Sequence, residues 1–323
     1  MAKISDTAIN GHFTGKDILS LDQFSPSDIQ LLFKHVSDMA KIAKNAKASD
    51  LLKGNIVTLI FYEPSSRTFG SFSASVKQLG GQTVEIQNPQ SFSSVSKGET
   101  LEDTMRVFEA YCDAIVIRHP VQGTAEKAAA ACTAVPIINA GDGVGEHPTQ
   151  ALLDLYTIYE KHGRLDNLTG LAAGDILNGR TVHSLIKGLS LYEGNTLYLL
   201  SPEQLRLSKT DYDKFSKKGI KLIEISNENE IPKDCDFWYW TRVQKERFTD
   251  MQEYESVKNK FIITPKLLAE YGNENLIIMH PLPRVGEIET TIDDDDRAVY
   301  LKSQIRNGMY VRMALVALVL GRL

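Results

Sequence analysis

Cysteine is scarce in this chain. Its 323 residues include Cys112, Cys132 and Cys235 and no other cysteine, which is too few, at too wide a spacing, for a disulfide framework or a zinc cluster. We expect each thiol to behave as a small buried side chain in a reducing compartment. The sequence also lacks the His and Glu spacing of a metal hydrolase and the Ser-His-Asp pattern of an acyl-enzyme. It therefore predicts neither a metal nor a cofactor.

An excess of positive charge and a long apolar run are also missing. The 36 basic and 41 acidic residues give a net charge of −5, which argues against a nucleic-acid partner. The most apolar segment, residues 309–320, is too short to cross a bilayer and is interrupted by Arg312. Residues 1–15 contain one lysine, no arginine and no apolar run, unlike a secretory signal. We therefore expect a cytoplasmic protein with no membrane partner.

Apolar runs alternate with segments of helical periodicity along the chain. The runs predict strands at residues 56–61, 82–86, 114–117, 135–138, 171–173, 196–200, 220–225, 237–240 and 276–279. Helices are predicted at residues 26–48, 68–79, 99–112, 124–132, 150–159, 180–191, 202–217, 265–271 and 303–321, and an exposed polar loop at 87–98. The alternation predicts an α/β fold of two doubly wound parallel-sheet domains joined by interdomain helices. One domain is expected to comprise residues 1–147 and 302–323, the other residues 148–301.

One strand-to-helix junction carries an unusual group of polar residues. Ser65, Ser66, Arg67 and Thr68 follow the apolar run at 56–61 and precede the predicted helix. The first turn of a helix has free backbone N–H groups and the positive end of the helix dipole. Hydroxyls and a guanidinium at that place predict a cradle for an oxyanion. The alternative is an ordinary helix cap beside a surface arginine.

Other polar clusters follow other predicted strands. Ligands of open α/β sheets bind beyond the carboxyl ends of the strands, so these clusters are candidate binding residues. His147 could donate a hydrogen bond to a carbonyl oxygen, or could simply cap a helix. Each arginine taken alone could form a surface salt bridge, but several cations suit a substrate with more than one anionic group. The cations are Arg67, Lys97, Arg118, Arg180 and Arg242. Together they predict an enzyme that joins an oxyanion-bearing donor to a second anionic substrate.

Several of these motifs resemble those of the transcarbamoylase family. Residues 65–68, Ser-Ser-Arg-Thr, are similar to its carbamoyl-phosphate motif Ser-Thr-Arg-Thr. Its other signatures are matched by Arg-His-Pro at 118–120, His-Pro-Thr-Gln at 147–150 and His-Pro-Leu-Pro-Arg at 280–284. Residues 180–184 and 241–247 resemble the aspartate-specific branch. The resemblance covers nearly the whole chain in the family's order.

The resemblance implies transfer of a carbamoyl group from carbamoyl phosphate to the amine of L-aspartate, in de novo pyrimidine (UMP) biosynthesis. It implies that carbamoyl phosphate is bound by Ser65, Ser66, Arg67, Thr68, Ser93, Lys97, Arg118, His147, Gln150, Pro281 and Leu282. Aspartate would be bound by Lys97, Arg180, Arg242 and Gln244. The catalytic residues would be Arg67, Thr68, Arg118 and His147. Ser93 and Lys97 would come from a neighbouring subunit, which implies a homotrimer with shared active sites.

Two alternatives remain. The first is an ornithine-type or other transcarbamoylase, but the ornithine branch carries His-Cys-Leu-Pro where this chain has His-Pro-Leu-Pro at 280–283. A cationic co-substrate would also be repelled by Arg180 and Arg242. The second is a non-catalytic anion-binding homologue, and the presence of every motif residue argues against it. The acidic run Asp293–Asp296 belongs to no predicted site, and we expect it to be a solvated turn.

Overall fold

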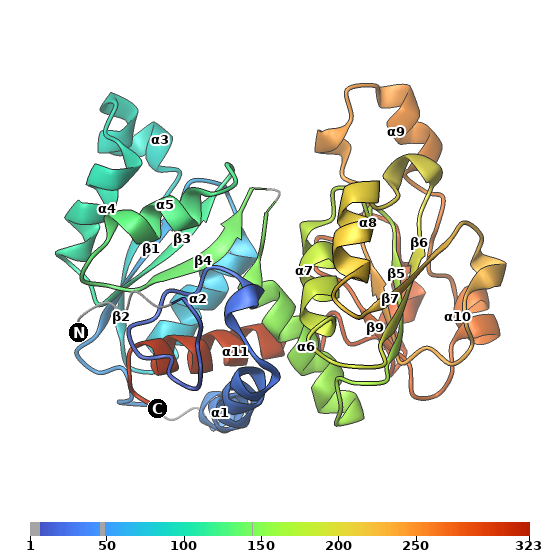
Figure 1. Cartoon of the computed structure of the whole chain (residues 1–323), viewed down its shortest axis with the longest axis horizontal. Coiled ribbons are helices and arrows are strands. Elements are labelled where there is room, and N and C mark those ends of the chain that lie inside the picture. Colours follow the sequence, from blue (N-terminus) through green and yellow to red (C-terminus); the bar gives the residue numbers. More distant parts are fainter. Residues whose placement is uncertain (1–6, 46–48, 144) are drawn as a thin grey trace. The chain divides into compact units, whose positions relative to one another are not determined.

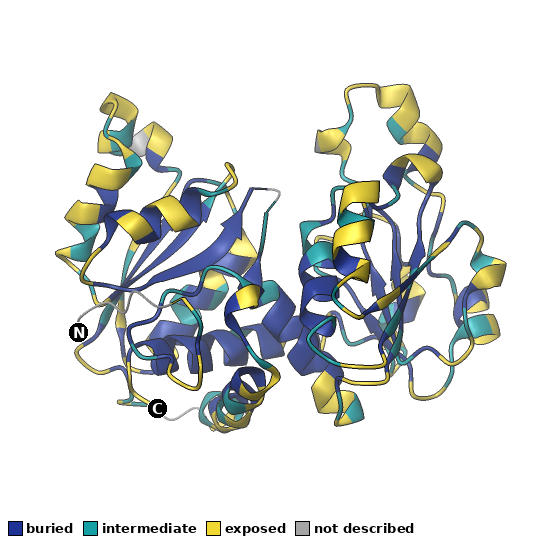
Figure 2. Ribbon diagram, viewed as in Figure 1, coloured by how far each residue is buried: buried dark blue, intermediate teal, exposed yellow. Residues whose placement is uncertain are grey.

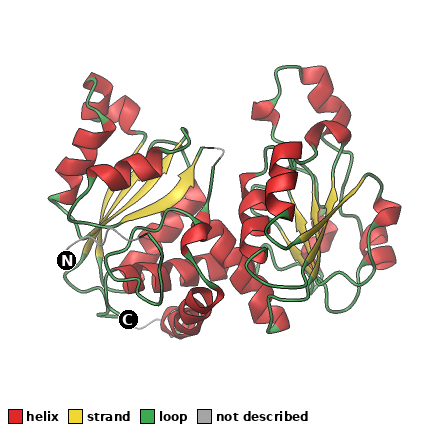
Figure 3. Cartoon of the chain, viewed as in Figure 1, coloured by secondary structure: helices red, strands yellow, loops and turns green. Residues whose placement is uncertain are grey.

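A computed structural model describes residues 7–45, 49–143 and 145–323 (Figure 1). The chain divides into two compact units, one of Met1–Leu153 with Arg306–Leu323 and the other of Asp154–Ile305. The first boundary falls within α6 (Pro148–His162) and the second near the start of α11 (Ser303–Val319). None of the helices in the described residues is both long and apolar enough to cross a membrane. Each unit contains a parallel sheet with helices beside it (Figure 3).

The first unit contains a parallel sheet with the strand order β2-β1-β3-β4. Its strands are β1 (Ile56–Phe61), β2 (Gln82–Gln87), β3 (Ala114–His119) and β4 (Ile137–Asp142). Its helices include α1 (Pro26–Lys44), α2 (Ser66–Gln78), α4 (Leu101–Glu109) and α5 (Thr124–Ala131). The chain runs from β1 to β2 on one side and then crosses to β3 on the other. Because parallel crossovers are right-handed, this reversal puts helices on both faces of the sheet.

Each face of the first sheet is covered by its own set of helices. Met105 of α4 and Ala128 of α5 share a buried cluster with Ile115 and Ile117 of β3. On the α2 side, Ser75 Oγ donates to the carbonyl oxygen of Met309 in α11 over 3.1 Å. Figure 2 shows α11 as almost wholly buried, in keeping with its apolar sequence. The last long helix of the chain is therefore part of the first unit's core.

The second unit contains a parallel sheet with the order β7-β6-β5-β8-β9. Its strands are β5 (Thr169–Ala173), β6 (Thr196–Leu200), β7 (Lys221–Ile225), β8 (Phe237–Trp240) and β9 (Ile277–Met279). Its helices include α7 (Arg180–Leu189), α8 (Lys209–Ser216), α9 (Met251–Val257) and α10 (Pro265–Tyr271). Every residue of β8 is buried, as expected for a central strand covered on both faces. Trp238 and Trp240 point into one cluster that also contains Ile263 and Tyr300.

The predicted α/β fold with two parallel sheets is confirmed, and each predicted strand is present within a few residues of its expected bounds. The helix predicted from residue 26 is α1, which Ser25 caps and Pro26 begins. The predicted end of that helix, at residues 46–48, lies outside the described residues. Cys132 and Cys235 are buried as expected, whereas Cys112 is partly exposed.

Three local predictions hold only in part. Residues 87–98 are largely exposed, as predicted, but they are not a loop throughout, because they contain α3 (Pro89–Phe92) and the 3-10 helix η2 (Ser94–Lys97). The predicted helix at 202–217 is broken: a 3-10 turn, η3 (Glu203–Leu205), is followed by α8, which starts after the N-cap Ser208. The acidic run is not simply solvated. Asp293 accepts hydrogen bonds from Arg284 and Tyr300.

Candidate active site

Both sheets bring predicted ligand residues to the place where the strand order reverses. In the first sheet this place lies between β1 and β3, whose carboxyl ends lead to Arg67 and Arg118. In the second it lies between β5 and β8, whose carboxyl ends lead to Arg180 and Arg242. The loops of two such strands turn to opposite faces and leave a crevice, which is where open α/β sheets bind ligands. Each unit therefore has arginines at the place where a crevice is expected, and we refer to these two places as the first and second crevices.

The first crevice includes the start of α2. Ser65 holds the N-cap position but, within the described part of the chain, makes no side-chain cap hydrogen bond. It is therefore not the ordinary helix cap that was the alternative interpretation of this segment. Ser66 and Arg67 are exposed, Ser65 is half-buried and Thr68 is buried. The amide groups of a helix's first turn have no partner within the helix, so those at the start of α2 are available to an anion.

Arg118 approaches the same crevice from β3. Its side chain is buried, and Nη1 donates to the carbonyl oxygen of Ala140 over 3.1 Å. Nη2 lies 2.8 Å from Oε2 of Glu63, in the loop after β1. A Cβ atom at Gly141 would come within 2.7 Å of Nη1, so glycine is needed for the guanidinium to pass. These contacts fix Arg118 against both neighbouring strands.

His147 is buried immediately before α6. Its carbonyl oxygen accepts from the amides of Gln150 and Ala151 over 2.9 and 3.2 Å, so His147 is the N-cap residue of α6. Its Nδ1 lies 3.5 Å from the hydroxyl of Thr149. The segment before it is held by Glu146, whose carboxylate accepts hydrogen bonds from Ser20 and Leu21. His147 and Gln150 thus lie at the carboxyl end of β4, next to β3.

Ser93 and Lys97 lie elsewhere in the first unit. They follow β2, which is the edge strand of the sheet, rather than β1 or β3. The Ser93 hydroxyl donates to the carbonyl oxygen of Pro89 over 2.7 Å and accepts from the amide of Val95. It therefore caps η2, while Lys97, the last residue of η2, is exposed.

In the second unit a buried carboxylate joins the two loops that carry the predicted aspartate ligands. Asp175 is fully buried and accepts hydrogen bonds from the amides of Asn178 and Gln244 over 3.0 and 3.4 Å. The Gln244 side chain donates to the carbonyl oxygen of Asn178 over 3.0 Å. Burial raises the pKa of Asp175. The structure thereby brings together Arg180, at the start of α7, and the Arg242–Gln244 segment.

Gly174 permits the close approach of these same two loops. It has φ +109°, and a Cβ atom there would lie 2.0 Å from the carbonyl oxygen of Thr241. Thr241 in turn donates to the carbonyl oxygen of Ala173 through its amide, over 2.8 Å, and through its hydroxyl, over 3.0 Å. Arg242 directly follows Thr241, which these two hydrogen bonds hold in place, so the backbone position of Arg242 is fixed.

Pro281 and Leu282 lie in the loop after β9. Leu282 has φ +56°, a left-handed conformation that costs a leucine about 1–3 kcal/mol. The peptide bond between Leu282 and Pro283 is cis. The amide of Leu282 donates to Nδ1 of His280 over 2.8 Å, and Nε2 of His280 lies 2.6 Å from Oε1 of Glu287. The buried side chains of His280 and Glu287 thus hold the loop in place.

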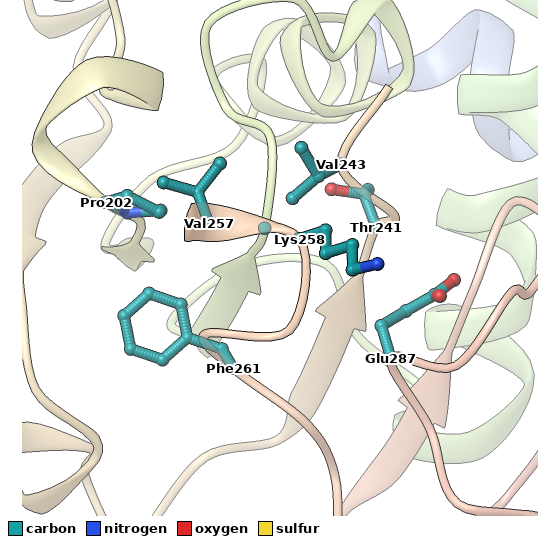
Figure 4. A pocket seen from close by; sticks show the side chains of 8 residues that line it. Pro202, Thr241, Val243, Val257, Lys258, Phe261 and Glu287 are labelled. Atoms are coloured by element: carbon teal, nitrogen blue, oxygen red, sulfur yellow. The ribbon is translucent and has the colours of Figure 1, made fainter. Parts of the chain in front are cut away.

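A small pocket lies beneath the second unit's loops (Figure 4). Its cavity volume of about 10 Å³ is at the lower limit for a single water molecule, far too small for a substrate. Thr241 and Glu287 both line it, so the loops after β8 and β9 border the same space. Its other lining residues are Gly174, Pro202, Val243, Val257, Lys258 and Phe261. We interpret it as a small packing void between the loops rather than as a substrate site.

The residues that support the two crevices cannot be recognised from the sequence alone. Glu146, Asp175 and Glu287 are single acidic residues with no repeat or spacing around them. Their importance comes from burial and from the hydrogen bonds that they accept from backbone amides. Among the described residues no group of three or more His, Cys, Asp or Glu side chains is arranged to hold a metal ion.

Comparison with known protein families decides the family. The carbamoyl-phosphate-binding domain of aspartate/ornithine carbamoyltransferases matches residues 16–160, and the aspartate/ornithine-binding domain matches residues 166–319. The chain belongs to the aspartate/ornithine carbamoyltransferase family. The match covers most of both units, including both crevices.

Individual relatives agree with this assignment. The aspartate carbamoyltransferase catalytic subunit of Methanobrevibacter smithii is 44% identical, over 94% of this chain and 94% of its own length. The multifunctional protein pyr1-3 of Dictyostelium discoideum is 46% identical over 98% of this chain, which spans only 14% of that protein. The solved structure of Trypanosoma cruzi aspartate transcarbamoylase, in complex with carbamoyl phosphate and aspartate, is similar with a TM-score of 0.87 and 39% identity. That match covers 95% of this chain and 98% of the other.

Proposed function

We propose that this protein is an aspartate carbamoyltransferase. It transfers the carbamoyl group of carbamoyl phosphate to the amine of L-aspartate and yields N-carbamoyl-L-aspartate and phosphate. The observation that carries the proposal is the presence of guanidinium groups at the strand-order reversal of each sheet. Such groups bind planar and tetrahedral anions through several donors at once. The relatives named above are aspartate enzymes, which favours aspartate over ornithine.

The first unit is proposed to bind carbamoyl phosphate. Ser65, Ser66, Arg67 and Thr68 would hold the phosphate together with the amides at the start of α2, where the helix dipole favours an anion. Thr68, Arg118 and His147 would donate to the carbamoyl oxygen. Arg118 is well suited to this role because its burial keeps its guanidinium in one place and in a medium that strengthens charge interactions.

The second unit is proposed to bind aspartate. Arg180, Arg242 and Gln244 would hold its two carboxylates. Asp175 holds together the two loops that carry them, through the amides of Asn178 and Gln244. Gln150 of the first unit and the carbonyl oxygens of Pro281 and Leu282 would accept hydrogen bonds from the carbamoyl NH₂ group. An ornithine side chain would bring a cation to Arg180 and Arg242, which is unfavourable.

The chemistry would proceed without a covalent enzyme intermediate. The deprotonated aspartate amine attacks the carbamoyl carbon, and the negative charge that develops on the carbamoyl oxygen is stabilised by Thr68, Arg118 and His147. The tetrahedral intermediate collapses, the bond to phosphate breaks, and Arg67 stabilises the departing phosphate. The phosphate accepts the amine proton, so no side chain has to act as a general base. The rate gain would come from positioning and from oxyanion stabilisation.

We further propose a homotrimer in which Ser93 and Lys97 complete the site of a neighbouring subunit. The exposure of Lys97, and its position after an edge strand, support this assignment. Lys97 would contact both substrates. A cytoplasmic location and a role in de novo pyrimidine (UMP) biosynthesis are part of the same proposal.

The direct test is a colorimetric assay of the purified protein with carbamoyl phosphate and either aspartate or ornithine. Formation of carbamoyl-aspartate, with little or no citrulline, is the expected result. Citrulline as the main product would replace the proposal with the ornithine activity. If neither product forms but a phosphonate analogue with a succinate tail binds, the protein is a non-catalytic anion-binding homologue.

A further inference from the structure

A buried chain of hydrogen bonds supports the loop after β9. His280 and Glu287 are only 2% and 5% exposed. One oxygen of the Glu287 carboxylate lies 2.6 Å from Nε2 of His280, and the other accepts from the amide of Val285 over 3.0 Å. Nδ1 of His280 accepts from the amide of Leu282 over 2.8 Å. A single carboxylate therefore reaches two points of the loop, one directly and one through the imidazole.

These contacts specify which ring nitrogen of His280 carries the proton. A backbone amide can only donate, so Nδ1 must accept from Leu282 and carries no proton. The proton is therefore on Nε2 and is donated to Glu287. Burial alone would raise the pKa of Glu287, but the hydrogen bonds from His280 and from backbone amides lower it. Both oxygens of Glu287 accept in this arrangement, as those of an ionised carboxylate do, and this favours the Nε2 tautomer.

The loop needs such a restraint at Leu282. Its φ of +56° is a conformation that leucine does not favour, so the chain would relax without an opposing contact. In the other tautomer, an N–H of His280 would face the N–H of Leu282 and the two would repel each other. The backbone of His280 itself is held by Gln304, which accepts from its amide over 3.0 Å. The imidazole is thus a fixed point from which Leu282 is held.

We propose that Glu287 is a positioning residue for carbamoyl transfer. It sets the tautomer of His280, and His280 in turn orients the carbonyl oxygens of Pro281 and Leu282 toward the carbamoyl NH₂ group. This inference rests on the proposed function, since those carbonyl oxygens matter only if a carbamoyl donor binds. Figure 4 shows the Glu287 side chain at the pocket that Thr241 also lines. Glu287 does not touch substrate, and its effect reaches the reaction only through His280 and the loop.

The test is the substitution Glu287→Gln. The Gln side chain has a single accepting oxygen and its NH₂ group only donates, whereas His280 and Val285 contact different oxygens of the Glu287 carboxylate, so one of the two contacts loses its acceptor. The amide either loses the Val285 contact or donates to Nε2 and drives the His280 proton onto Nδ1. We expect kcat to fall about 10- to 100-fold, since misplacement of a reacting group by about 1 Å costs that much. KM for aspartate should stay within about twofold, because Arg180 and Arg242 lie on other loops.

The matched control is His162→Gln, in the same unit. His162 is also largely buried and its Nε2 lies 3.0 Å from a backbone carbonyl oxygen, that of Asp236, which precedes β8. It is therefore at the amino end of the strands, away from the crevice. Its kcat should be unchanged even if its melting temperature falls. Equal losses of kcat in the two variants, or none in Glu287→Gln, would overturn the proposal.

A second measurement needs no variant. Selective ¹⁵N labelling of histidine in the wild-type protein reports the tautomer of His280 directly, with assignment by comparison with His280→Asn. We expect a proton on Nε2 and none on Nδ1 at neutral pH. The opposite tautomer, or a doubly protonated ring, would refute the inference even if Glu287→Gln fails to fold. If the wild-type protein does not carbamoylate aspartate, the proposed function fails while this measurement still tests the His280–Glu287 pair.

Discussion

Arg67 and Arg118 present their charges to the first crevice in different ways. Arg118 is buried and is held by Glu63 and by a backbone carbonyl, so its position is set before any ligand arrives. Arg67 is exposed in the first turn of α2, where an ion from solvent can reach it. A buried, fixed donor suits a charge that develops during the reaction, and an exposed donor suits an ion that enters and leaves. The two arginines are therefore not interchangeable.

Arg67→Ala should remove activity and leave the fold intact. We expect kcat to fall by about 10²- to 10³-fold, the usual cost of losing one donor to a developing negative charge. Because Arg67 is exposed, the melting temperature should change little. Carbamoyl-aspartate formation and thermal unfolding measure the two effects. Arg106→Ala, which removes another exposed arginine of the first unit, is the control and should be fully active. Normal kcat in Arg67→Ala would remove this residue from the mechanism.

The residues that we propose to touch ligands stand out in the sequence, whereas those that support them do not. Arg67, Arg118 and His147 follow strands or begin helices, and that pattern is visible in the chain. Asp175 and Glu287 gain their roles from amides that are distant in sequence or hidden by burial, such as that of Gln244. A lone aspartate or glutamate is usually a surface residue, so nothing in its neighbourhood distinguishes it. Roles of this kind become visible only when the tertiary contacts are known.

At the scale of elements, the junctions between strands and helices determine where the site residues lie. The chain's apolar runs predict the strands because central parallel strands are buried on both faces. The helical periodicity is misleading at 202–217, where Ser208 begins a new helix by accepting from the amide of Asp211. That cap lies within an otherwise helical composition, and periodicity alone does not separate one long helix from a turn and a short one. The register of β5 beside β8, by contrast, comes from pairing that no local pattern encodes.

Gly174→Ala tests the junction between β5 and β8. The added Cβ atom would meet the carbonyl oxygen of Thr241 at 2.0 Å, so the two loops have to separate. Gly219→Ala is a matched control, because Gly219 also has a positive φ, +93°, but nothing lies within 4 Å of its Cβ position. We expect Gly174→Ala to lower the free energy of unfolding by about 2 kcal/mol more than the control. It should also raise KM for aspartate. Equal stability and equal KM in the two variants would contradict the close approach.

The link between β2 and α2 should depend on pH. Glu85 of β2 accepts hydrogen bonds from Ser73 and Lys77 of α2 over 2.6 and 2.8 Å. Burial alone would raise the pKa of Glu85, but these bonds and one from Thr83 lower it from 4.5 to about 2. A carboxylate with a lowered pKa in the folded state stabilises the fold above its unfolded pKa. That stability is lost as the pH falls from about 4.5 toward 2.

The measurement is urea unfolding at about pH 6 and about pH 3 for the wild type and for Glu85→Gln. The Glu85 side chain is 32% exposed, so we expect a contribution of about 1 kcal/mol rather than the full value of its pKa shift. The wild type should lose about 1 kcal/mol more than the variant between the two pH values. Parallel losses in both proteins would show that Glu85 is not responsible.

At the scale of the whole molecule, the proposal of shared active sites makes a strict prediction. Lys97→Ala and His147→Ala chains should each be inactive as pure proteins. After unfolding and refolding together, mixed trimers should contain some sites in which both residues are intact, and activity should partly return. Mass spectrometry of the assemblies can verify that subunits have exchanged. Verified exchange with no recovery of activity would exclude a site built from two subunits.

The division of the first unit into two separate stretches of chain has a consequence for biosynthesis. Its core needs α11, which binds α2 through Ser75 and Arg312 and lies more than two hundred residues further along the chain. While the ribosome is still synthesising the second unit, the first unit lacks α11, and the apolar surface that α11 covers is exposed. The second unit, continuous in sequence, can mature ahead of it. We therefore expect the amino-terminal half of a nascent chain to remain incompletely folded until α11 has been synthesised.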